Sequence, residues 1–86
     1  MLDMRAKFIV TGVEVTSNDK GETVGERWTF AAVAKSGGYP DDGHDDDNTF
    51  ARWSPSANLV IYCVNPALFG NYKVNDKVYA DFTPAN

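Results

Sequence analysis

The segment from Pro40 to Asn48 gathers the side chains with the clearest chemical potential. Five of the twelve acidic residues of the chain fall within it: Asp41, Asp42, Asp45, Asp46 and Asp47. Clustered carboxylates are the ligands that Ca²⁺ prefers. The spacing departs from an EF-hand loop, because the glycine comes too early and no glutamate closes the loop. A solvated charged loop is the favoured interpretation, and a weak Ca²⁺ site formed by these aspartates is the alternative.

Nucleophilic catalysis would have to use His44 and Cys63, the only histidine and the only cysteine of the chain. Such a pair would need the two side chains to meet through folding. Cys63 lies on the core-facing side of its predicted strand, where a cysteine is usually inert. No Gly-x-Ser-x-Gly, P-loop or dinucleotide-binding glycine motif occurs in the chain. We therefore predict that the protein is not an enzyme.

The aromatic side chains predict a binding role more clearly than any residue predicts catalysis. Strand alternation predicts that Tyr62 and Tyr79 face away from the core, while Tyr39, Trp53 and Tyr72 fall in or beside loops. Surface rings near arginine and lysine are typical of protein-binding hot spots, and they can equally stack on single-stranded nucleic acid. A purely packing role for the rings is the alternative. The predicted binding residues are Tyr39, Trp53, Tyr62, Tyr79, Arg52 and Lys77.

The charge of the chain is unevenly spread. The formal net charge is −4, but without the five loop aspartates eight bases face seven acids, a net of +1. A nearly neutral body with one acidic loop matches neither a DNA mimic nor a basic nucleic-acid binder. The absence of a basic patch favours a protein partner over nucleic acid.

Length and apolar content indicate one small folded domain. Eighty-six residues, 43% of them hydrophobic, suit a single domain over residues 1–86. No stretch approaches the roughly 20 apolar residues that cross a bilayer, and the start of the chain lacks the apolar segment of a secretory signal. One cysteine fits a reducing cytoplasm.

The hydrophobic period is two almost everywhere, which predicts strands. The apolar parity switches near Gly12, which predicts a β-bulge, and a polar hairpin loop follows at 17–22. Further strands are predicted around Trp28–Ala34, Thr49–Trp53, Leu59–Val64 and Lys77–Phe82. The strand at Leu59–Val64 is apolar on both faces, as expected of a central strand. Asn65 to Gly70 predicts one helical turn, and residues 36–48 predict a mobile acidic loop.

Five short strands with one bulge favour an all-β fold with a minor helical turn. We expect a small five-stranded antiparallel barrel or roll, SH3-like or OB-like, because closure removes exposed edges. The helical turn before the last strand resembles the SH3-like order more than the OB order. A homo-oligomer is plausible because small sheets often bury an open edge against a copy.

Both ends of the chain resemble a group of small tailed-bacteriophage proteins without assigned roles. The shared features are a Met-Arg-Ala-Lys-Phe start, the Asn65-Pro66-Ala67 turn and an ending with Tyr79-Ala80-Asp81-Phe82-Thr83-Pro84-Ala85, whereas residues 36–48 diverge. The resemblance implies a viral protein in the host bacterial cytoplasm or in the virion. Its motifs carry fold information and assign no catalytic or binding residue.

These observations predict a non-catalytic phage protein that binds another protein, either a virion component or a host factor such as a defence enzyme. The first alternative is a small β-barrel that binds single-stranded nucleic acid. The second is a structural or decoration protein that depends on a cation such as Ca²⁺. Apart from that ion we predict no cofactor, and we expect no contact with a membrane.

Overall fold

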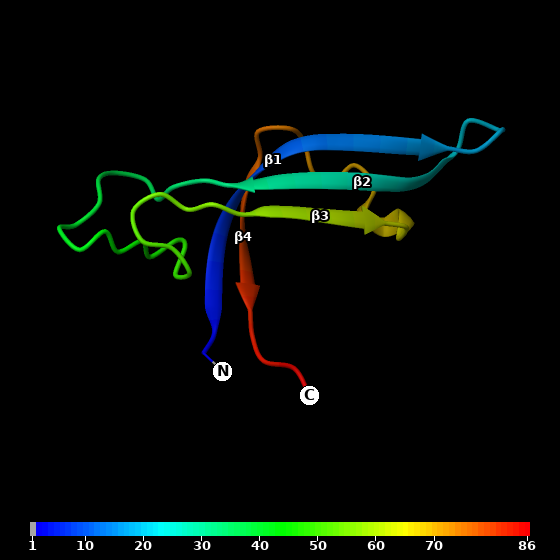
Figure 1. Cartoon of the computed structure of the whole chain (residues 1–86). Helices are drawn as coiled ribbons and strands as arrows, with labels where there is room; N and C mark the ends of the chain where they lie inside the picture. The colour runs from blue at the N-terminus through cyan, green and yellow to red at the C-terminus, as the bar shows by residue number, and fades with distance from the viewer. Residues whose placement is uncertain (1) are drawn as a thin grey trace.

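The computed structural model describes residues 2–86 and shows one antiparallel sheet with the strand order β3-β2-β1-β4 (Figure 1). The strands are β1 (Met4–Ser17), β2 (Thr23–Ala32), β3 (Asn58–Cys63) and β4 (Lys77–Phe82). A single 3₁₀ turn, η1 (Pro66–Leu68), lies between β3 and β4, and the Asn65 side chain caps it. The predicted all-β class with one helical turn is confirmed.

A β-bulge allows β1 to pair with two neighbouring strands, β2 and β4. Val10 pairs with Phe30 and Gly12 pairs with Thr29, so Thr11 is the extra residue. A Cβ on Gly12 would lie 2.7 Å from the Thr29 hydroxyl oxygen, which explains the glycine. The first half of β1 pairs with β4 and the second half with β2, and the strand bends sharply between them (Figure 1). The bulge predicted near Gly12 is therefore confirmed.

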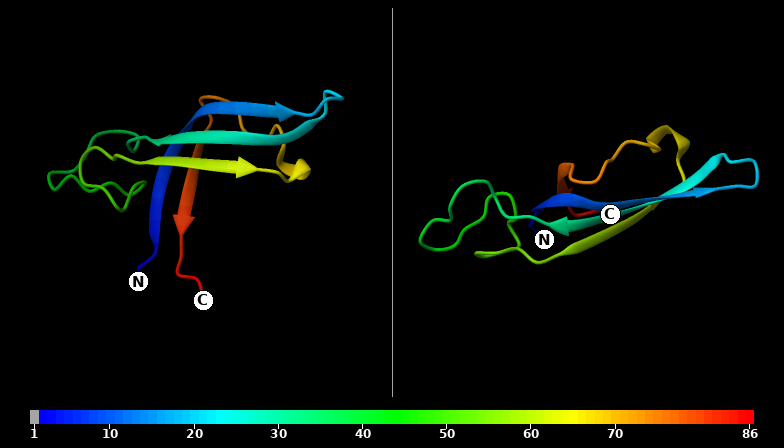
Figure 2. Two further views of the ribbon diagram at one scale, coloured as in Figure 1. Left: turned by 45° about the vertical axis from the view of Figure 1, so that its right-hand side comes forward. Right: turned by 90° about the horizontal axis from the view of Figure 1, so that it is seen from above.

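The core lies between one face of the sheet and the segment that joins β3 to β4. That segment, residues 64–76, runs along one side of the sheet (Figure 2, right). Its Tyr72 ring stands edge-on to Trp28 at 4.7 Å and to Phe30 at 5.6 Å, so Tyr72 belongs to the core and not to the binding surface. The buried apolar side chains are Ala6, Phe8, Val10, Trp28, Phe30 and Cys63.

A buried glutamate fastens this covering segment to β2. The carboxylate of Glu26 accepts a hydrogen bond from the Trp28 indole (2.7 Å) and another from the Gly70 backbone amide (2.9 Å). Glu26 occupies a core-facing position of β2, where the alternation by itself calls for an apolar residue. Its two donors compensate for the removal of the carboxylate from water.

The predicted five-stranded barrel or roll is not confirmed, because residues 49–53 do not form a strand. The Asn48 and Ala51 amides make turn hydrogen bonds to the Asp45 and Asn48 carbonyls, and Trp53 has a φ of +67°, which is incompatible with an extended strand. Only one isolated bridge, between His44 and Arg52, forms in this region. Without a fifth strand to connect β3 to β4, the sheet stays open.

The placement of β3 also differs from the prediction. Its apolar side chains on both faces indicate a central strand covered from both sides, yet it pairs with β2 alone and lies at the edge of the sheet. Ile61, Tyr62 and the following Val64 are all exposed. The alternation gave the correct strand, but strand order depends on pairing between distant segments.

The resulting molecule is long and thin. Its extents are 56 × 33 × 16 Å, and its radius of gyration is 15.7 Å, against about 12 Å for a compact domain of this length. Between residues 2 and 86 there is no helix with the length and apolar character needed to traverse a membrane.

The Glu26 contacts give a prediction for stability. Replacing Glu26 with Ala leaves the Trp28 indole and the Gly70 amide without acceptors, so we expect the free energy of unfolding to fall by about 2 kcal/mol. Urea unfolding followed by tryptophan fluorescence measures it. Glu22→Ala, at an exposed hairpin residue, is the control and should change little. Equal stability of both variants would contradict this role of Glu26.

Candidate binding surface

The face of the sheet opposite the core, called the outer face below, carries the predicted outward tyrosines. The registers bring Arg5 opposite Asp81, Lys7 opposite Tyr79, and Arg27 between Glu14 and Tyr62. The bulge keeps this face consistent along β1, because it restores the parity after Thr11. The outer face comprises Arg5, Lys7, Ile9, Glu14, Arg27, Thr29, Ala31, Val60, Tyr62, Lys77, Tyr79 and Asp81.

At one end of the outer face, Tyr79 is held from two sides. The guanidinium of Arg5 lies 4.6 Å from the centre of the Tyr79 ring, and the Tyr79 hydroxyl donates to Asp47 (3.0 Å). Arg5 also donates from Nε to Asp81 (2.7 Å) and from Nη2 to the same carboxylate (3.1 Å). These hydrogen bonds lower the pKa of Asp81 and raise that of Arg5. Lys77 lies exposed at the start of β4.

At the other end, Tyr62 forms a similar pair with Arg27. The guanidinium of Arg27 lies 5.9 Å from the ring centre and donates to the Tyr62 hydroxyl (3.3 Å), which raises the pKa of Arg27. It also donates to Glu14 (2.7 Å). Tyr62 is 72% exposed, the largest exposure of any aromatic ring in the described chain. The outward direction predicted for Tyr62 and Tyr79 is thus what the structure shows.

In the described part of the chain, three of the four cations of the outer face are matched by carboxylates, Lys77 being the exception. Arg5 pairs with Asp81, Lys7 with Asp47 (3.3 Å) and Arg27 with Glu14. An arginine that already holds a carboxylate has less capacity to bind a phosphate. The outer face therefore presents aromatic and aliphatic area within a balanced charge pattern.

The acidic loop is anchored to β1 through two buried polar residues. Asp45 and Asn48 are both fully buried. The Asn48 amide accepts from the Lys7 backbone N–H (2.8 Å) and donates to the Val33 carbonyl (2.8 Å) and to Asp45 (3.2 Å). These contacts give residues 36–48 defined attachment points. The mobility predicted for this loop stays a prediction, which amide hydrogen exchange would measure.

Four of the five loop carboxylates have partners within the protein. Asp45 accepts from the backbone amides of Asp47 and Asn48, and Asp42 accepts from the His44 amide. Asp46 lies 2.7 Å from the His44 imidazole, and Asp47 contacts Lys7 and Tyr79. Asp41 is exposed. The carboxylates thus point to different partners, and within residues 2–86 no group of three or more acidic, histidine or cysteine side chains is arranged around a common point.

Three of the predicted binding residues pack within the loop itself. The Trp53 ring lies over Gly43, where a Cβ would come within 2.7 Å of ring atoms, and Tyr39 stands edge-on to Trp53 at 5.9 Å. Arg52 donates to the Asp42 carbonyl (2.5 Å). The Tyr39 hydroxyl contacts Asp45 (3.4 Å), and burial together with this carboxylate raises the pKa of Tyr39. The structure does not bring this group to Tyr62, which lies on β3.

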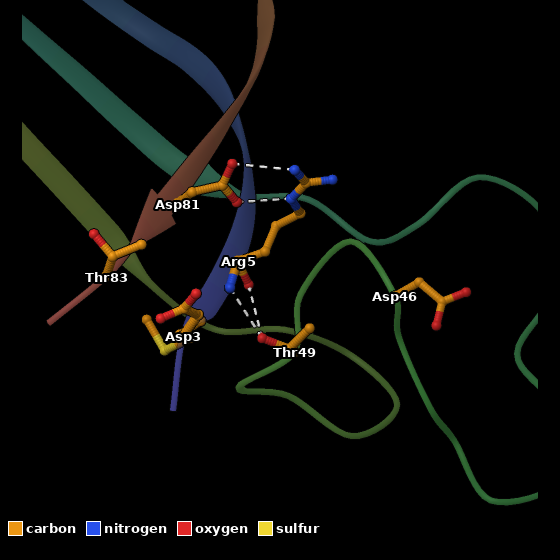
Figure 3. Close-up of a pocket in the computed structure, with 7 residues that line it drawn as sticks. Asp3, Arg5, Asp46, Thr49, Asp81 and Thr83 are labelled. Atoms are coloured by element: carbon orange, nitrogen blue, oxygen red, sulfur yellow. Dashed lines mark hydrogen bonds and ion pairs between the residues drawn. The ribbon is translucent and has the colours of Figure 1, made fainter. Parts of the chain in front are cut away.

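A shallow hollow of about 510 Å³ lies at the end of β1 and β4, beside the Arg5–Asp81 pair (Figure 3). Thr49 supports it from the loop, because its hydroxyl accepts from the Arg5 backbone N–H (2.9 Å). Asp3 and Asp46 contribute further carboxylates to its margin. With Asp81, three carboxylates and one guanidinium line the hollow, which gives it an acidic character.

Sequence reasoning missed the residues that hold the tyrosines in place. Arg5, Arg27 and Asn48 were not among the predicted site residues, although Arg5 and Arg27 occupy outward positions on their strands. Strand alternation alone could have predicted that both arginines lie on the outer face. It could not predict the strand order that places each arginine beside a tyrosine. Cys63 is buried at the end of β3, and the loop that holds His44 lies at the other end of that strand (Figure 1).

Comparisons of the chain with protein-family models, curated proteins and solved structures found no match.

The loop anchor makes stability depend on pH. Burial raises the pKa of Asp45, but hydrogen bonds from the Asn48 side chain and from the backbone amides of Lys35, Asp47 and Asn48 outweigh it and hold the pKa below its ordinary value of 3.8. A depressed folded-state pKa stabilises the fold above the ordinary value, and this stability is lost as the pH falls through the folded-state pKa. Asp45→Asn should therefore be less stable than the wild type at pH 7, by about 1–2 kcal/mol.

Urea unfolding from pH 7 down to below about pH 4 measures this difference, which should shrink on acidification. Asp41→Asn, at an exposed position of the same loop, is the matched control. A gap between wild type and Asp45→Asn that stays constant with pH would contradict an ionised, hydrogen-bonded Asp45.

Proposed function

We propose that this chain is a non-catalytic, phage-encoded binding protein that contacts another protein through its outer face. The observation that carries the proposal is the pair of arginine-supported tyrosines, Tyr62 with Arg27 and Tyr79 with Arg5, at the two ends of one sheet face. Tyrosine and arginine dominate the energetics of protein interfaces. The partner is a virion component or a host factor, and the phage origin rests on the resemblance of the two chain ends.

The support of each ring lowers the cost of binding. A tyrosine already held by a guanidinium, and in Tyr79 also by Asp47, loses little rotamer freedom when a partner covers it. Such preorganised rings offer a large contact area at small entropic cost. The balanced charges around them suit a partner surface that is itself mixed in charge.

Single-stranded nucleic acid is the second candidate, because a guanidinium over an aromatic ring on an open sheet face is also a platform for stacking bases. The pairing of Arg5, Lys7 and Arg27 with carboxylates argues against it. This candidate requires that the protein bind a labelled oligonucleotide and that its affinity fall steeply as the salt concentration rises. Flat fluorescence anisotropy at low salt would dismiss it.

A cation-dependent structural or decoration role is a further proposal. Fewer carboxylates are free to bind the cation, because Asp45, Asp46 and Asp47 have partners within the chain. Calorimetry with millimolar Ca²⁺ tests it. Heat that disappears in an Asp41→Asn, Asp46→Asn double variant would support it, and no heat would remove it.

Substituting the exposed ring tests the protein-binding proposal. We expect Tyr62→Ser to weaken capture of the partner from purified virions or infected-cell extract by about 30-fold, the effect of losing a hot spot of about 2 kcal/mol. Quantitative mass spectrometry of immobilised wild type and variant measures the captured protein. Leu68→Ser is the matched control, since Leu68 is exposed on the segment that covers the core face.

The control should capture as much partner as the wild type. A partner retained equally by wild type and Tyr62→Ser would contradict recognition through this ring of the outer face.

A further inference from the structure

The edge strand β3 has the composition of a strand with neighbours on both sides. No charged residue occurs between Arg52 and Lys73, and β3 lies in the middle of this segment. Val60 points to the outer face and Ile61 to the core face, and both are exposed. Natural edge strands usually carry charges, prolines or bulges that prevent pairing with another chain. β3 has none of these within Asn58–Cys63.

The other free edges are protected in that way. β4 carries Lys77 and Asp81 on an otherwise open edge. The half of β1 that extends beyond β4 contains the bulge and continues through Glu14 and two hydroxyl residues, Thr16 and Ser17. The edge of β3 is thus the least protected edge of the sheet.

The backbone of β3 has free groups in the right positions for another strand. The Ala32 amide donates to the Ala57 carbonyl (2.9 Å), which identifies the hydrogen-bonded pairs between β2 and β3. Because hydrogen-bonded pairs alternate along an antiparallel ladder, the backbone N–H and C=O groups of Leu59, Ile61 and Cys63 face β2. The backbone groups of Asn58, Val60 and Tyr62 therefore point away from β2. Three successive free positions form an edge to which an antiparallel strand can bind.

The exposed surface of the chain is larger than that of a typical monomer. The accessible area is 6013 Å², against about 5,000 Å² for a monomer of 9.5 kDa. The excess of about 1,000 Å² is comparable to the roughly 800 Å² that each partner buries in a stable complex.

Apolar surface continues at both ends of β3. Near its start, a hollow of about 210 Å³ is lined by Phe50, Leu59 and Phe82. Near its end, a hollow of about 290 Å³ is lined by Val24, Tyr62 and Val64. In a two-fold antiparallel arrangement the start of one β3 lies beside the end of the other, so each hollow adjoins the partner's apolar strand.

From these observations we propose that two copies of the chain associate edge to edge through β3, in antiparallel orientation. The two four-stranded sheets then form one continuous sheet with β3 and its copy at the centre. The free N–H and C=O groups of Asn58, Val60 and Tyr62 pair across the two-fold axis. The dimer does not depend on the proposed function, because the outer face stays open on both copies.

A proline at position 60 tests the proposal without disturbing the intrachain ladder. The Val60 N–H points to the free edge, so Val60→Pro removes a donor that only a second strand would use. Light scattering after gel filtration should give twice the chain mass of 9.5 kDa for the wild type at submillimolar concentration. Val60→Pro should raise the dimer dissociation constant by at least about tenfold, whereas Val60→Thr, which retains the N–H and the β-branch, should remain dimeric.

Near-UV circular dichroism of the packed Trp28 and Tyr72 rings verifies that the variants are folded. If Val60→Pro does not fold, hydrogen exchange of the Tyr62 amide in the wild type decides, because dimerisation makes its protection rise with protein concentration. A wild type that is monomeric throughout, a folded Val60→Pro that stays dimeric, or fast Tyr62 exchange independent of concentration would each overturn the proposal. A wild type that dimerises but captures no partner would count against the proposed function alone.

Discussion

The pairing of one strand with two different neighbours is the constraint on which the rest of the structure depends. β1 holds β4 over Met4–Ile9 and β2 over Phe8–Ser17, so the two halves of the sheet are joined only through this strand. If Thr11 continued the regular alternation and no bulge formed, Val13 and Val15 would face the same side as Lys7 and Ile9, and the apolar set would be divided between two faces. The bulge keeps one core face and one outer face through the bend.

The anchored loop binds the part of β1 that extends beyond the end of β2. Arg5 and Lys7 direct backbone groups away from β4, and these are bound by Thr49 and Asn48 and by the Val33 amide. Side chains and turns thus satisfy this edge of β1 without a fifth strand. The same loop supplies Asp47 to the Tyr79 hydroxyl, so the anchor of the fold also positions part of the outer face.

Charge and apolar area are distributed in a way that suits the proposed role in recognition. Three of the four cations of the outer face are paired with carboxylates, whereas the segment that contains β3 carries no charge. Affinity on such a surface comes from buried rings and strand pairing, with charge pairs contributing mainly to orientation. The thin shape gives the molecule more surface for contacts than a compact domain of its length would have.

The sequence by itself determined the local features: the bulge at Gly12, the 3₁₀ turn capped by Asn65, the outward direction of Tyr62 and Tyr79 and the buried Cys63. Each follows from side-chain alternation or from the conformational preference of one residue, and both are local. Only the tertiary structure decided that β3 is an edge strand, that Tyr72 is a core ring, that residues 49–53 turn, and that arginines support the two tyrosines. These depend on pairing between segments far apart in the chain, and the hydrophobic period carries no information on which strands pair.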